Sequence, residues 1–102
     1  MGYKLTHLAE EQLVECYLFG YQHFGEHKAE QYLIDIQDCF DLLGDNPRLA
    51  RVRKGYGLAL RVHHHKRHYV AYTIEGETDD ILVLSILHDS MDLARHLGQA
   101  SP

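Results

Sequence analysis

The alternation of apolar and polar residues is strongest between residues 58 and 86, where it has the period of a β-strand. The runs 69–74 and 81–86 are rich in Val, Ile, Leu and Tyr, which favour strands. The polar stretch 63–68 predicts a hairpin loop between two of these strands. In the first run Leu58, Leu60 and Val62 fall on one face, and Ala59, Arg61 and His63 fall on the other. The pattern therefore predicts three neighbouring strands that surround a basic loop.

Two earlier segments carry apolar residues at steps of three and four, which predicts two helices. The first begins after Thr6 or His7, and Phe24-Gly25 breaks its pattern. The second is closed by Gly44, and Asn46-Pro47 prevents its continuation. With about two to four residues between them, the helices form an antiparallel hairpin whose apolar faces need a flat partner. These faces contain Ala9, Leu13, Cys16, Tyr17, Gly20 and Phe24 in the first helix, and Ala29, Tyr32, Leu33, Ile36, Phe40 and Leu43 in the second.

Shorter elements complete the prediction. Residues 3–6 form a candidate strand, residues 51–55 a weaker one before a turn at Tyr56-Gly57, and residues 89–97 a short helix that Asp89 or Ser90 caps. The predicted fold is α+β: an N-terminal strand, a two-helix hairpin, a mostly antiparallel sheet of three to four strands and a short C-terminal helix. One face of the sheet lies under the helices and the other is open, and Arg61 points from the open face.

Chain length and apolar runs limit the class of protein. A chain of 102 residues forms one domain and buries roughly 65% of the surface that its unfolded form exposes. Neither an apolar run of ~18 residues nor a charged-then-apolar leader is present, so we expect a cytoplasmic protein without a membrane partner. Cys16 and Cys39 lie among apolar residues of the predicted helices, which indicates buried thiols rather than a disulfide.

The charges are segregated along the chain, although the net charge is only −5. Residues 1–47 carry two lysines against nine acids, and residues 75–102 carry Arg95 against six. Residues 48–74 contain no acid, and their seven cations are Arg48, Arg51, Arg53, Lys54, Arg61, Lys66 and Arg67. This segregation favours binding to an anionic partner, either nucleic acid or an acidic protein segment, over a merely solvated sheet surface.

Four histidines, His63, His64, His65 and His68, raise the question of a metal site. Strand alternation would put His63 and His65 on one side. A metal site needs further ligands that are held rigidly by supporting contacts, and a hairpin tip offers neither. We therefore predict solvated histidines, with no metal and no cofactor.

The order of several residues resembles the RelE/ParE superfamily of toxins from bacterial toxin-antitoxin systems. The resemblance extends from about residue 3 to residue 97, and its most specific part, 87–97, is similar to the ParE branch. It implies a strand, a helical hairpin and an antiparallel sheet. The residues that carry it are Ala9, Tyr17, Phe24-Gly25, Ala29, Tyr32, Asn46-Pro47, Leu60-Arg61, His68-Tyr69-Val70-Ala71-Tyr72 and Ile86-Leu87-His88-Asp89-Ser90-Met91-Asp92, followed by Arg95-His96-Leu97.

The resemblance implies one of two activities. ParE-like toxins bind and poison DNA gyrase, which stalls replication and arrests growth, whereas RelE-like relatives cleave messenger RNA on the ribosome. Arg61 and His88 match functional positions of certain RelE-like nucleases, and Tyr72 or Lys66 would complete a metal-independent catalytic set. However, a nuclease that holds RNA usually needs a strongly basic surface, and this chain is acidic overall. The ParE-like ending and the charge both favour gyrase binding, with no catalytic residue.

The resemblance also implies a partner. A cognate antitoxin, ParD-like or another small DNA-binding type, would wrap its C-terminal segment around the toxin in a hetero-oligomer, and the toxin alone would not bind DNA directly. An inactive family member that acts only with its antitoxin is a third possibility. The residues predicted to bind the target or the antitoxin are Arg48, Arg51, Arg53, Lys54, Arg61, Lys66, Arg67, His88, Met91 and Arg95.

Overall fold

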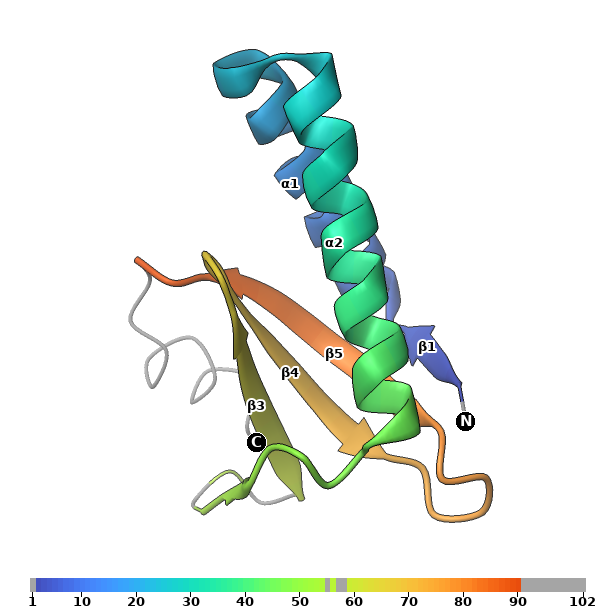
Figure 1. Cartoon of the computed structure of the whole chain (residues 1–102). Coiled ribbons are helices and arrows are strands. Elements are labelled where there is room, and N and C mark those ends of the chain that lie inside the picture. The colour runs from blue at the N-terminus through green and yellow to red at the C-terminus, as the bar shows by residue number, and fades with distance from the viewer. Residues whose placement is uncertain (1, 55, 57–58, 91–102) are drawn as a thin grey trace.

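The computed structural model describes residues 2–54, 56 and 59–90. Its strands form one sheet in the order β1-β5-β4-β3-β2, in which β1 runs parallel to β5 and the other neighbours are antiparallel (Figure 1). This confirms the predicted α+β fold. The elements are β1 (Tyr3–Leu5), α1 (His7–Phe24), α2 (Glu26–Asp45), β2 (Val52–Arg53), β3 (Leu60–His65), β4 (His68–Ile74) and β5 (Ile81–His88).

The helical hairpin begins at Thr6, whose hydroxyl accepts a hydrogen bond from the Ala9 amide at 3.1 Å. The predicted connection of two to four residues is too long, because Gly25 alone separates the helices, with a φ of 88° that favours glycine. The predicted end of α2 at Gly44 is one residue short: Gly44 is buried within the helix, and Asn46 caps it. The hairpin projects well beyond the strands at its Gly25 end (Figure 1).

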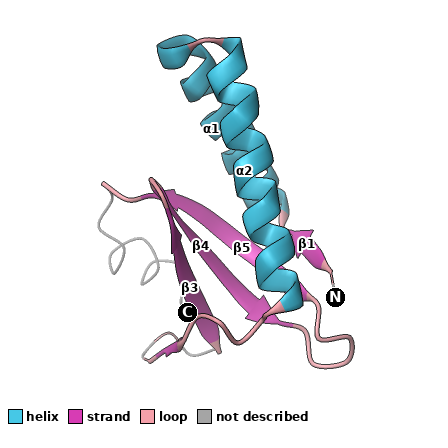
Figure 2. Cartoon of the chain, viewed as in Figure 1, coloured by secondary structure: helices cyan, strands magenta, loops and turns pink. Residues whose placement is uncertain are grey.

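The main core lies where the other half of the hairpin covers one face of the sheet (Figure 2). Phe40 from α2 is fully buried, and its ring centroid lies 5.2 Å from that of Tyr3. Burying such large side chains is the main stabilising contribution of this layer. The buried members from both layers are Ala9, Ile36, Cys39, Phe40, Leu43, Ala50, Val70, Tyr72, Ile81, Val83 and Ile86.

The opposite face of the sheet is not open, which corrects the prediction. It carries a second buried cluster of Leu60, Val62, Ala71 and Leu87. Arg61 pairs across the strands with Tyr72, a member of the main core, so Arg61 lies on the helix-facing side. The alternation in this run correctly predicted a strand. Its apolar face, which carries Leu60 and Val62, belongs to the second cluster rather than to the layer beneath the helices.

The predicted hairpin loop 63–68 is also too wide. β3 continues to His65 and β4 begins at His68, so only Lys66 and Arg67 form the turn, with a φ of 52° at Lys66. The three histidines of β3 keep the strand alternation: His63 pairs with Val70 of the main core, while His64 pairs with Tyr69 on the other side. The strand β3 therefore continues through the polar residues 63–65.

A bulge interrupts the pairing of β4 with β5, because Ala71 pairs with Ser85 whereas Tyr72 pairs with Val83. Two side chains from the N-terminal region satisfy the backbone there. The Thr6 hydroxyl donates to the Leu84 carbonyl at 2.9 Å, and the Gln12 Oε1 accepts from the Ile86 amide at 2.7 Å. The bulge is therefore tied to the start of α1.

Several predictions fall near the margins of the described residues. β2 confirms a strand within 51–55, while Gly57, Leu58 and most of the predicted helix 89–97, including Met91 and Arg95, lie outside the described residues.

Cys16 and Cys39 are free thiols, as predicted; Cys39 is buried and Cys16 half-buried. Among the described helices, neither has the length and apolar character that a membrane span requires.

Candidate functional site

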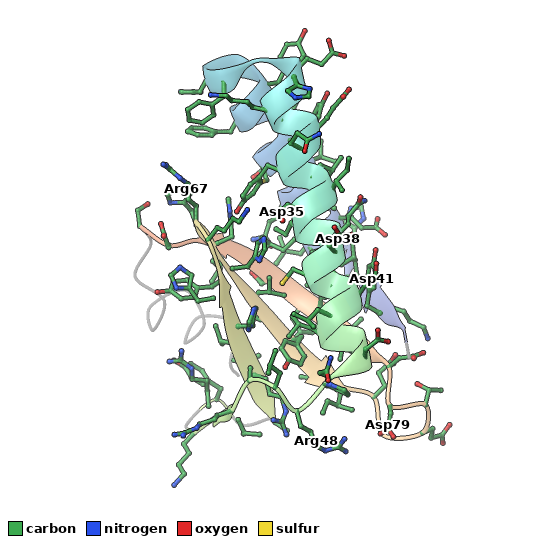
Figure 3. The ribbon with its side chains drawn as sticks, viewed as in Figure 1. Asp35, Asp38, Asp41, Arg48, Arg67 and Asp79 are labelled. Atoms are coloured by element: carbon green, nitrogen blue, oxygen red, sulfur yellow. The ribbon has the colours of Figure 1, made fainter. Side chains whose placement is uncertain are left out.

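Residues 48–74, which contain no acid, carry their cations at the two ends of β3. The segment 48–54, here called the cationic segment, contains β2, which pairs with the first residues of β3. Lys66 and Arg67 form the turn at the opposite end. Figure 3 shows Arg67 beside the β3–β4 turn and Arg48 near the opposite end of the sheet. The block that is continuous in sequence therefore gives two separate cationic surfaces.

The cationic segment is held by two hydrogen bonds to backbone carbonyls. Arg61 donates from Nη1 to the Ala50 carbonyl at 2.6 Å, and the Tyr72 hydroxyl donates to the Pro47 carbonyl at 2.8 Å. Arg61 does not pair with Asp89, because the guanidinium is turned to the cationic segment and Asp89 lies beside His64 and His88 at the other end of the sheet. The exposed side chains of the cationic segment include both cations and apolar groups: Arg48, Leu49, Arg51, Val52, Arg53 and Lys54.

The four residues considered for RNA cleavage lie in two places. Arg61 and Tyr72 are cross-strand partners. Lys66 and His88 lie at the turn end of the sheet, which is four or more residues, or roughly 13 Å, along the strands from that pair. Tyr72 is fully buried, and burial raises the pKa of its hydroxyl. The structure does not bring these four side chains into one site, and their roles in RNA cleavage stay predictions.

At the turn end of the sheet, a cavity of about 540 Å³ lies between the helical hairpin and the β3–β4 turn; we call it the hairpin pocket. Its apolar wall includes Phe19 and Phe24, which are 53% and 54% exposed. The described residues that line it are Cys16, Phe19, Gly20, Phe24, Lys28, Ala29, Tyr32, Lys66, Arg67, His68 and His88. This lining contains three cations and, among the described residues, no acid. An adjoining cavity of about 480 Å³ shares several of these side chains.

His68 joins both helices to the sheet at one wall of the hairpin pocket. The Tyr32 hydroxyl lies 2.7 Å from Nδ1, and the Cys16 Sγ lies 3.6 Å from Nε2. Burial, with a smaller contribution from His88, lowers the pKa of His68 to about 4, so the ring is neutral near pH 7. Since a neutral imidazole carries one N–H, the ring donates one of these contacts and accepts the other.

The two neighbours of His68 are also held in their neutral forms. Burial, together with the nearby Cys16, raises the pKa of Tyr32 to about 12. Burial likewise raises the pKa of the Cys16 thiol, so this sulfur is not an activated nucleophile. The group therefore acts as a positioning network rather than as acid–base machinery.

The β3–β4 turn is fixed to α2 by Asp35. Its carboxylate pairs with Lys66 and lies 3.5 Å from the His65 Nε2, and the hydrogen bond from Lys66 holds the pKa of Asp35 below its usual range. Figure 3 shows Asp35 on α2 in line with Asp38 and Asp41. Lys66 is thereby largely neutralised, whereas Arg67 forms no ion pair with the described residues.

The histidines do not gather into a metal centre within 2–54, 56 and 59–90, where no three His, Cys, Asp or Glu side chains converge suitably. The His64 ring packs against Tyr69 in a tilted arrangement, with ring centroids 4.6 Å apart, and its Nε2 lies 3.6 Å from the Asp89 carboxylate. His88 lies 2.7 Å from the Ser90 hydroxyl. These contacts give His64 and His88 local structural roles.

Sequence reasoning missed most of the hairpin pocket. It placed Cys16 and Phe24 on a core-facing stripe, and it did not single out Phe19 or Lys28. One signal was available, because α1 carries more apolar residues than one helix face can bury. Those that are about half exposed are Leu8, Val14, Leu18, Phe19, Tyr21 and Phe24. Exposed apolar side chains concentrated on one helix indicate a protein interface.

Comparisons with known proteins give matches of sequence and of fold. The family described as "ParE toxin of type II toxin-antitoxin system, parDE" matches residues 3–93. Toxin ParE1 of Mycobacterium tuberculosis is 34% identical over 99 residues, which cover 93% of this chain and 96% of the relative. Toxin ParE1 of Caulobacter vibrioides is 22% identical, over 94% and 97%. A solved structure titled "Chromosomal ParDE TA system from P. aeruginosa" matches the fold with a TM-score of 0.71 and 22% identity, over 86% of this chain and 95% of that one.

Proposed function

Because the chain belongs to the ParE family of toxins from type II toxin-antitoxin systems, we propose that it arrests growth by binding DNA gyrase in the cytoplasm and that a cognate antitoxin neutralises it. The observation that carries the proposal is the family match over residues 3–93, joined by 34% identity to a ParE toxin along nearly the whole of both chains. The proposed mechanism is binding, with no chemical step and no cofactor.

The apolar surface of α1 supports an antitoxin partner. Val14, Leu18 and Tyr21 recur at steps of four and three on the side of α1 away from the core, and each is at least half exposed. A free toxin that shows this surface to water gains stability when a partner covers it. Proposed antitoxin contacts therefore include this side of α1 and, at the turn end, Lys66, Arg67 and His88.

The cationic segment supports a separate contact with the target. Its four cations are exposed, and Arg61 fixes the Ala50 carbonyl within it while Tyr72 fixes the Pro47 carbonyl directly before it. Exposed Leu49 and Val52 between these cations suit an acidic protein surface better than a phosphate backbone, which offers no apolar contact. We place the proposed gyrase contact at this segment.

Growth arrest tests the first part of the proposal. Induction of the chain alone in a bacterial host should stop growth, and co-expression of the adjacent reading frame should restore it. The two proteins should also purify together as a hetero-oligomer. A chain that is soluble, folded and harmless when expressed alone would count against a toxin.

Two assays with purified components identify the target. Supercoiling by gyrase should be inhibited by the chain and restored when the chain is first mixed with the antitoxin, while messenger RNA on translating ribosomes should stay intact. Cleavage of RNA without gyrase inhibition would assign the nuclease activity instead. Silence in both assays, with antitoxin binding retained, would indicate an inactive family member.

A further inference from the structure

We propose that Arg61 is a positioning residue for the gyrase contact: its guanidinium holds the cationic segment in the shape that binds, and it does not itself touch gyrase. The identity of the target rests on the proposed function, whereas the tether rests on the structure alone. The inference separates Arg61 from the exposed cations with which the sequence analysis grouped it, and it gives this side chain a role other than catalysis.

The cationic segment has little regular structure of its own. Residues 46–51, which connect α2 to β2, form neither helix nor strand (Figure 2). β2 is two residues long, and it pairs with β3 at the edge of the sheet. A strand this short contributes few hydrogen bonds, and an irregular loop keeps one conformation only where other groups satisfy its backbone. The segment therefore depends on side chains of the sheet to fix it.

Arg61 supplies the hydrogen bond that acts inside the segment. Its Nη1 donates to the Ala50 carbonyl at 2.6 Å, and Ala50 is buried in the main core. A hydrogen bond from a charged donor contributes more than one between neutral groups. The Tyr72 hydroxyl acts differently, because it fixes the Pro47 carbonyl directly before the segment and so sets where the segment begins.

The place of Arg61 in β3 directs it to the segment rather than to a partner. It is the cross-strand partner of Tyr72, on the side of the sheet that carries the main core. Burial raises the pKa of Tyr72 and the charge of Arg61 opposes this shift, because the two side chains are close. Arg61 is only partly exposed, whereas all four cations of the segment are exposed. A partner therefore meets those four cations, while the Arg61 guanidinium binds the backbone of its own chain.

A tether of this kind raises affinity by lowering the entropy cost of binding. A loop that is already held in its bound shape loses less conformational freedom when it meets a partner. Arg48 and Arg51 lie on either side of Ala50 in the sequence, so loss of the hydrogen bond to its carbonyl frees both cations together. Removing the Arg61 donor should therefore weaken the target contact although no contacting atom is removed.

Amide hydrogen exchange on the full chain, without any partner, tests the tether. The reporter is the Leu49 amide, which donates to the Asn46 carbonyl at 3.0 Å. Arg61→Met keeps an apolar stem and removes the donor, so exchange at Leu49 and along the rest of the segment should become about tenfold faster or more. Lys4→Met, which removes an exposed cation from β1, should change exchange in the segment less than about twofold. Unchanged exchange in Arg61→Met would overturn the proposal.

Supercoiling and antitoxin-binding assays separate positioning from a general loss of structure. Arg61→Met should raise the concentration that half-inhibits gyrase about tenfold and change the antitoxin Kd less than about twofold. Arg61→Lys keeps a charged donor, so its inhibition should lie within about threefold of wild type. Faster exchange with unchanged inhibition, or equal losses of gyrase inhibition and antitoxin binding, would overturn the proposal. If Arg61→Met does not fold, Arg61→Gln, which is too short to reach the Ala50 carbonyl, takes its place in these assays.

A double-mutant cycle with Arg51 distinguishes positioning from direct contact. If Arg61 acts through the segment, Arg61→Met should matter less once Arg51→Ala has removed a contacting side chain. The loss of inhibition in the double variant should then be smaller than the product of the two single losses. If Arg61 touches gyrase independently, the two losses multiply, and that result would overturn the proposal.

The outcome is separable from the proposed function. A wild-type chain that leaves gyrase fully active would overturn the proposed target, while amide exchange would still decide whether Arg61 fixes the cationic segment. Inhibition of gyrase that the folded Arg61→Met protein retains in full would overturn the positioning role alone.

Discussion

The Tyr32 hydroxyl on α2 and the His68 Nδ1 on β4 lie 2.7 Å apart, although the two residues are 36 positions apart in sequence. This contact joins the projecting part of the helical hairpin to the sheet. Cys16 on α1 touches the other ring nitrogen, so one imidazole connects three elements. The stability of this end of the molecule therefore depends on a polar network rather than on the main apolar core.

Tyr32→Phe should lower the free energy of unfolding by about 1–2 kcal/mol, because a half-buried ring nitrogen loses its hydrogen bond while the aromatic packing stays. Urea unfolding at pH 7 gives the measurement. Tyr21→Phe is the matched control, since Tyr21 is half exposed on the outer side of α1. A loss of the same size in both variants would show that the contact with His68 contributes nothing.

Acid should weaken the fold through His68. Its pKa is lowered from 6.5 to about 4 on folding, so the unfolded chain binds the extra proton between these values. The stability that depends on a neutral His68 is therefore fully present above about pH 6.5. It declines as the pH falls and is lost, with no further change, below about pH 4. The ring is not fully buried, so solvent screening reduces the effect to about 1–2 kcal/mol. The groups that face it are Cys16, Tyr32, His65, Arg67, His88 and Asp89.

His68→Gln isolates this titration, since it removes the ionisable ring and keeps polar groups that can bond Tyr32. Urea unfolding of both proteins at pH 7, 6, 5 and 4.5 gives the two pH profiles. The difference in unfolding free energy between wild type and variant should shrink by about 1–2 kcal/mol from pH 7 to pH 4.5. Parallel profiles would assign the acid sensitivity to other groups.

Local patterns in the sequence predicted the elements well but not how they face one another. The stripe on α2 is confirmed by the burial of Ile36, Phe40 and Leu43. The alternation of Leu60 and Val62 predicted a strand correctly, yet a period of two cannot say which of two faces lies under the helices, and here both faces are buried.

The polar network at the hairpin pocket was beyond prediction for a related reason. It depends on contacts between residues that are 36 and 52 positions apart, and nothing local in sequence records them. The charge block misled in the opposite way. Arg48 and Arg67 belong to one acid-free stretch, but a straight strand carries them to opposite ends of the sheet. Adjacency in sequence therefore overstated the size of the cationic surface.

Gln12 should be important for the bulge in β5. Its Oε1 accepts hydrogen bonds from the Ile86 amide at 2.7 Å and from the Ser85 hydroxyl at 3.2 Å. Gln12→Ala leaves a backbone donor in the sheet unsatisfied, which should cost about 1–3 kcal/mol of unfolding free energy. Gln12→Glu keeps an acceptor at this position and should lose less than half as much. Equal losses would mean that side-chain volume, rather than the acceptor, stabilises the bulge.

The proposed target contact predicts a specific loss of activity. Arg51→Glu should weaken gyrase inhibition about tenfold or more and leave the urea unfolding midpoint unchanged, because the side chain is exposed. Lys4→Glu makes the same charge change away from both surfaces and should inhibit gyrase as wild type does. Antitoxin binding by Arg51→Glu should also stay unchanged. If Arg51→Glu inhibits gyrase fully, the contact lies elsewhere on the toxin.

Tyr72→Phe separates the structural role of this tyrosine from a catalytic one. The hydroxyl is buried and donates to the Pro47 carbonyl, so its removal should cost about 1 kcal/mol of unfolding free energy through the backbone that leads into the cationic segment. Growth arrest should persist, since the protein remains folded and proposed binding uses other side chains. Tyr69→Phe, on the opposite face of β4, is the control. A general acid or base contributes about 10²–10⁴-fold to a rate, so a collapse of toxicity in a folded Tyr72→Phe protein, with Tyr69→Phe unaffected, would restore the nuclease alternative.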